Sequence, residues 1–172
     1  MIGNKEYDCK EMFRHACAFC EVADMAMHAL RHKTADIEKY VVPSIVNSAF
    51  ASEIFLKSLL KWHNIQFQKV HMLKSLYAFL PENLQTQIKQ MTSCGFKDMW
   101  VDPINREYLE LVSNAFQEWR YCFEHDFSKP YTVKNINTGF LANFRNALRD
   151  VCCQLYYGTT WDEYKRGYDG KR

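Results

Sequence analysis

Turn-forming residues are rare in this chain, which has only 6 glycines and 4 prolines among its 172 residues. Glycine supplies left-handed backbone conformations, and proline supplies the fixed φ angle that many sharp turns use. A chain with so few of them has few places to bend, so we expect a few long helices rather than many short strands. The length suggests one domain with a substantial core, since 48% of the residues are hydrophobic.

Apolar residues recur at steps of three and four over long segments, as one face of a helix requires. No stretch alternates apolar and polar residues cleanly, so we predict no sheet. The fold class predicted is all-α, an antiparallel bundle of four to five helices. The expected helices are 9–32, one that begins near Pro43 and runs to about 63, 71–80, one opened by Pro81, 104–125, and 137–157 with Gly158 as its stop.

The chain is expected to form a single helical domain over residues 1–160, followed by a short basic C-terminal tail over 161–172. The N-terminal segment is acidic where a signal peptide would be basic and then apolar. No apolar run approaches the roughly 20 residues that span a bilayer. These features predict a cytoplasmic protein with no membrane partner. The net charge of +2 is too small for binding of nucleic acid by bulk electrostatics, so a local patch would be needed.

Seven cysteines show no disulfide framework, because their number is odd and their spacing irregular. Cys17 and Cys20 form a C-x-x-C pair, but a zinc site needs a second pair with suitable spacing. Cys152 and Cys153 are adjacent and do not supply it. A redox site would place the pair just after a strand, whereas here it lies in a helical pattern. We therefore interpret these thiols as buried small hydrophobes and predict no metal and no cofactor.

The stretch "QEWRYCFEHDF" places Arg120, Glu124 and His125 at the end of a long apolar pattern. On one regular helix Arg120 and His125 point about 140° apart, so they reach one phosphate only if the helix ends or if a two-fold dimer brings two copies together. Arginine binds phosphate through a planar fork of donors, and histidine transfers protons near neutral pH. Glu124 either orients these groups or forms a surface ion pair with Arg120.

Three stretches together resemble the HEPN superfamily. Arg120 and His125 have the spacing of its R-x(4–6)-H motif, and "WRYCFEH" is similar to the aromatic-Arg-Tyr-x-x-Glu form of several branches. "NSAFASEIFLKSLLKW" looks like the second helix of the family, and "HMLKSLYAFLP" looks like the His-x-Leu-x-x-Leu stretch that follows it. The resemblance covers about residues 40–155, with the three stretches in the order that the family has.

The resemblance implies a helical bundle that dimerises, with the motif at the dimer cleft. Many members are metal-independent ribonucleases of toxin–antitoxin or phage-defence systems, so the implied function is cleavage of single-stranded RNA. By position, Arg120 would contact phosphate and His125 would be the acid or base. Asn47 or Ser48 would supply the polar group that some members place opposite the motif. The implied partners are RNA or a nucleotide, a second copy of the chain, and an antitoxin or nucleotidyltransferase.

Other interpretations stay open. Active members often carry Asn, Asp or His directly after the arginine, where this chain has Tyr121, which favours a non-catalytic module that binds a nucleotide, RNA or a protein. A third interpretation is a helical protein in which the stretch "QEWRYCFEHDF" is only core and a charged edge.

Glu53 is expected to pair with Lys57, and His71 to act as a cap or packing residue. The basic residues around the link after the second helix form either a phosphate-tracking patch or a solvated connection.

Overall fold

The structure is a computed structural model that describes residues 5–32, 37–93, 100–101, 107–121 and 136–169. Every element in these ranges is helical, apart from one isolated β-bridge between Val101 and Glu107. The all-α class predicted from the sequence is therefore confirmed. No helix within the described ranges has the length and apolarity needed to cross a membrane.

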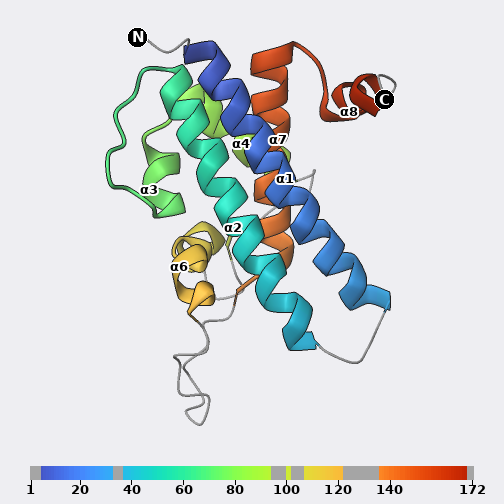
Figure 1. The fold of residues 1–172 in the computed structure, drawn as a ribbon. Helices are drawn as coiled ribbons and strands as arrows, with labels where there is room; N and C mark the ends of the chain where they lie inside the picture. The colour runs from blue at the N-terminus through green and yellow to red at the C-terminus, as the bar shows by residue number, and fades with distance from the viewer. Residues whose placement is uncertain (1–4, 33–36, 94–99, 102–106, 122–135, 170–172) are drawn as a thin grey trace.

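Three long helices build the core (Figure 1): α1 (Lys5–His32), α2 (Ile37–Trp62) and α7 (Thr138–Tyr157). The shorter α4 (Glu82–Ser93) packs against α7. Ser58 of α2 joins all three long helices, since its hydroxyl donates to the Cys9 carbonyl (3.1 Å) and lies 2.7 Å from the Tyr156 hydroxyl. Because the Ser58 proton points at Cys9, the Tyr156 hydroxyl is the donor in the second bond.

The prediction that the second helix begins near Pro43 is wrong, because α2 starts at Ile37 and carries Pro43 inside it. A proline inside a helix removes one backbone bond and costs about 3 kcal/mol or more. Val41, two residues before Pro43, packs against the hydrophobic core. The Asn47 side chain donates to the Pro43 carbonyl (2.7 Å). Tertiary packing and this local bond therefore offset the cost of Pro43, and the helix continues past it.

The single helix predicted over 104–125 is also wrong for the part that the structure describes. It is divided into α5 (Tyr108–Val112) and α6 (Ala115–Arg120). The break falls at Ser113, whose carbonyl accepts from the Leu73 amide (3.0 Å) and whose hydroxyl accepts from the Lys74 amide (3.0 Å). Ser113 thus satisfies the first N–H groups of α3 (Leu73–Ala78) instead of continuing its own helix. The apolar pattern cannot reveal this bond between distant segments.

The ends of α7 follow the sequence signals. The Asn137 side chain accepts from the Phe140 amide (2.9 Å) as an N-cap, and Gly158 closes the helix with φ 67°. Pro81 precedes α4, and its carbonyl accepts from the amides of Leu84 and Gln85 (both 3.0 Å). The predictions that Pro81 opens a helix and that Gly158 ends one are confirmed.

Within the segment predicted as a C-terminal tail, Trp161–Asp169 forms helix α8, which the sequence did not lead us to expect. Its start is a capping box in which Glu163 accepts from the Thr160 amide (3.0 Å) and donates its own amide to the Thr160 hydroxyl (3.3 Å). Hydrogen bonds from Thr159 and Thr160 lower the pKa of Glu163 to about 2. Trp161 and Tyr164 pack edge-on against Phe13 of α1 (ring centroids 6.3 and 5.6 Å). These rings attach the C-terminal helix to the core.

Candidate functional site

Arg120 is the last residue of α6. This helix lies beside α2 (Figure 1). The two helices meet through Phe116 and Phe50, whose rings stack with centroids 4.7 Å apart and planes 17° apart. The Arg120 guanidinium carbon lies 4.8 Å from the Phe116 ring centroid and 4.5 Å from that of Tyr121. Cation–π contacts of this kind hold the guanidinium plane while its N–H donors can still bind an anion.

Tyr121 has a physical role that its departure from the family motif did not suggest. Tyr121 is 44% exposed, and its ring adds a second aromatic surface against the Arg120 guanidinium. Exposed aromatic rings beside an arginine are the groups on which unpaired nucleobases stack. The tyrosine therefore fits contact with single-stranded nucleic acid better than it fits proton transfer.

Helix α6 ends at Arg120, where Tyr121 leaves the helical conformation with φ −111° and ψ 26°. A regular helix would have kept Arg120 and His125 about 140° apart. The chain turns before His125, so that constraint does not apply. His125 and Glu124 lie outside the described residues, and their proposed roles stay predictions.

The two polar candidates on α2 lie differently. Asn47 is half-buried one turn before Phe50, on the flank that faces α6, and its amide is bonded to Pro43. Ser48 is 5% exposed and turns inward, where its hydroxyl accepts from Arg145 of α7 (3.1 Å). Of the two, only Asn47 is on the Arg120 side of the helix.

A second polar cluster lies one turn further along the same flank of α2. Glu53 is 4% exposed, and its Oε1 lies 2.7 Å from the Lys57 ammonium and 2.8 Å from His71 Nδ1. The pairing of Glu53 with Lys57 that we predicted is confirmed. His71 binds Glu53 immediately before α3, so it is more than a packing residue. A sequence signal existed, since the glutamate and the histidine belong to two of the three stretches that resemble the family.

Three of the basic residues around the α2–α3 link are paired with carboxylates. Lys57 pairs with Glu53, and Lys61 pairs with Asp8 of α1 (2.7 Å). Lys74 pairs with Glu107 (3.1 Å) and Glu110 (2.6 Å), which raises its pKa. Paired lysines are less available to phosphate, so these three favour the structural interpretation.

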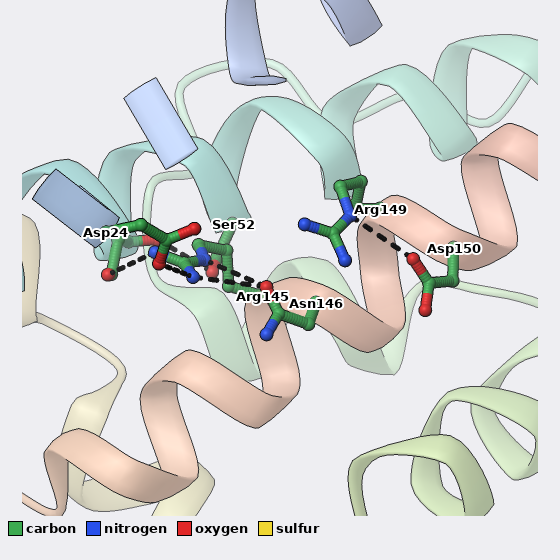
Figure 2. Close-up of polar contacts among 7 residues, drawn as sticks. Asp24, Ser52, Arg145, Asn146, Arg149 and Asp150 are labelled. Carbon is green, nitrogen blue, oxygen red and sulfur yellow. Dashed lines mark hydrogen bonds and ion pairs between the residues drawn. The ribbon is translucent and has the colours of Figure 1, made fainter. Parts of the chain in front are cut away.

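Arg145, on the inner face of α7, was not singled out from the sequence (Figure 2). It is 2% exposed and donates to Asp24 of α1 (2.5 Å), Ser48 of α2 (3.1 Å) and the neighbouring Asn146 (3.1 Å). One turn later, Arg149 donates to Asp150 (3.2 Å) and covers the Trp161 ring. A buried arginine with partners on three helices tethers the bundle, and its position in an apolar stripe was the available signal.

The cysteines of the C-x-x-C pair lie in the core, as predicted. Cys17 and Cys20 are 9% and 2% exposed, and burial raises the pKa of both thiols, that of Cys20 to about 11. A thiol with a raised pKa is a poor nucleophile and metal ligand. Within the described residues no group of three or more His, Cys, Asp or Glu side chains is arranged to hold a metal ion.

The chain matches no protein-family model, no curated protein and no solved structure. The functional argument therefore depends on the geometry above and on the resemblance of the three stretches.

Proposed function

We propose that this protein is a HEPN-like, metal-independent endoribonuclease that cleaves single-stranded RNA. The observation that carries the proposal is Arg120, exposed at the end of α6 and held between the rings of Phe116 and Tyr121. An arginine fixed on aromatic faces, beside an exposed tyrosine, offers one group for a phosphate and another for a base. This combination suits a flexible single strand better than a duplex.

In the proposed reaction Arg120 binds the scissile phosphate and offsets the charge that develops on its oxygens. The ribose 2′-oxygen attacks phosphorus, the bond from phosphorus to the 5′-oxygen breaks, and a 2′,3′-cyclic phosphate and a 5′-hydroxyl result. His125 moves a proton to or from one of these oxygens. The proposed active form is a homodimer with the two motifs at one cleft, and an antitoxin or nucleotidyltransferase is the proposed protein partner.

A second candidate function is RNA binding without cleavage. Tyr121 favours it, because this residue stands where active members of the family often carry Asn, Asp or His. In that case Arg120 and the two rings would still bind single-stranded RNA, and His125 would have no role in catalysis.

Cleavage of end-labelled single-stranded RNA in excess EDTA tests the first proposal. Wild-type protein should yield 2′,3′-cyclic phosphate ends, while Arg120→Ala should lower the rate about 10²–10³-fold and His125→Ala about 10²–10⁴-fold. Arg166→Ala removes an exposed arginine from α8 and is the matched control, which should cleave at the wild-type rate. RNA that is bound but never cut would favour the second function, and RNA that is neither bound nor cut would contradict both.

A further inference from the structure

We propose that His71 is a second proton-transfer residue of the same site, a general base for the ribose 2′-hydroxyl that Glu53 holds in position. This inference rests on the proposed ribonuclease function. It comes from the geometry of three side chains, Glu53, Lys57 and His71, which bring together a buried carboxylate, an ammonium and an imidazole.

The contact with Glu53 defines which nitrogen of His71 carries the proton. Nδ1 lies 2.8 Å from Glu53 Oε1, and the same oxygen accepts from the Lys57 ammonium at 2.7 Å. An ionised carboxylate accepts from both groups and has no proton to donate. His71 Nδ1 must therefore be the donor, and in the neutral ring Nε2 is left with the lone pair that can accept a proton.

Because Lys57 already balances the charge of Glu53, the His71 ring does not have to be charged to bind this carboxylate. The Lys57 ammonium neutralises the Glu53 carboxylate and lies 3.5 Å from His71 Nδ1. A second full positive charge on the ring is not needed to balance the carboxylate and would face the ammonium. The His71 side chain is 51% exposed, so a substrate can approach the ring. In the described part of the chain no hydrogen bond occupies Nε2.

Glu53 also has an oxygen that a purely structural ion pair does not explain. Oε2 is buried, and none of the described residues bonds to it. A buried carboxylate oxygen without a partner is costly and rare in proteins, and a catalytic role is one explanation for such an atom. Both strong contacts fall on Oε1, so the carboxylate is arranged to hold His71 rather than to satisfy its own acceptors.

His71 and Arg120 lie on the same flank of α2. Glu53, which holds His71, is three residues beyond Phe50, a rise of about 4.5 Å, and Phe50 stacks on the Phe116 ring beneath Arg120. The start of α3 is bonded to Ser113, which lies between α5 and α6. Figure 1 shows α3 and α6 on this one side of α2. A single strand that runs along this flank can meet His71 and Arg120 in turn.

The proposed step balances without a metal or a redox partner. His71 Nε2 takes the proton of the 2′-hydroxyl as the bond from the 2′-oxygen to phosphorus forms. The bond from phosphorus to the 5′-oxygen breaks, and the leaving oxygen takes a proton from His125 or from water. Glu53 stays ionised throughout and stabilises the imidazolium that forms, so it is a positioning residue.

The substitution His71→Asn separates a catalytic role from a structural one. The asparagine amide can still donate to Glu53 from about the place of Nδ1, but it has no basic nitrogen in place of Nε2. We expect about a 10²–10⁴-fold loss of RNA cleavage with unchanged RNA affinity and unchanged circular dichroism. His63→Asn, which changes an exposed histidine in the same link, is the control and should cleave normally.

Glu53→Gln tests the positioning role, and nitrogen NMR of the His71 ring tests the tautomer. The wild-type ring should carry its proton on Nδ1, and the variant should lose that preference and show a lower kcat with unchanged KM. If His71→Asn cleaves like the wild type, the inference is wrong while the proposed function stands. If His71→Asn is inactive but Arg120→Ala and His125→Ala are active, the Arg120–His125 motif is not the active site, and the role of His71 as a base is supported. If the wild type never cleaves RNA, both fall.

Discussion

Two buried charged residues, Arg145 and Glu53, differ in how fully their polar atoms are hydrogen-bonded. Arg145 donates to Asp24, Ser48 and Asn146, as a buried guanidinium needs. Glu53 has both of its contacts on one oxygen and leaves the other bare. The pairing of Arg145 fits a structural role, and the unpartnered oxygen of Glu53 fits the role that we propose for this residue.

The role of Arg145 predicts the effect of removing its partner. Asp24→Ala leaves the buried guanidinium with fewer acceptors, and should lower the free energy of unfolding by about 1–2 kcal/mol. The effect is modest because the Asp24 side chain is 58% exposed, so water can replace part of the contact. Glu21→Ala, an exposed carboxylate on the same helix, should change stability by less than about 0.5 kcal/mol. Urea unfolding of the two variants gives the comparison, and equal losses would contradict this assignment.

At the scale of helices, sequence patterns predicted the helical class, the end of α7 at Gly158 and the start of α4 after Pro81. These signals are local, since a capping side chain or a glycine acts within one turn. Helix α8 was missed although its capping box, Thr160 and Glu163, is a local signal. The start of α2 and the break at Ser113 were missed because they depend on contacts between distant segments. The same holds for the site, where Arg120 and His71 were visible in the sequence but the Phe50–Phe116 stack was not.

Two glycines near the C-terminus should respond oppositely to one substitution. Gly158 has φ 67°, so Gly158→Ala should cost about 1–2 kcal/mol through left-handed strain. Gly167 lies inside α8 with open space around it, so Gly167→Ala should stabilise that helix by about 0.5–1 kcal/mol. Thermal unfolding followed by circular dichroism measures both. A similar change of the same sign in the two variants would contradict the assigned helix ends.

At the scale of the whole molecule, α2 packs in the core on one side and carries residues of the proposed site on the other. Its inner face packs against α1 and α7, where Ser48 and Ser58 make bonds across the core. Its outer flank carries Phe50 and Glu53 toward α6 and α3. A rigid central helix is a suitable support for the proposed site, whose groups lie on α6 and just before α3. The proposed dimer would bring a second such flank to the same RNA.

The most direct test of this account is to map where RNA lies on the protein. A short single-stranded RNA with 2′-O-methyl riboses, which cannot be cleaved, would carry photoreactive uridines and be cross-linked to the full chain. Mass spectrometry should then find cross-links in the peptides that contain Phe116, Arg120 and His71. Cross-links confined to α8 or to the outer face of α1, or none at all, would contradict the proposed site.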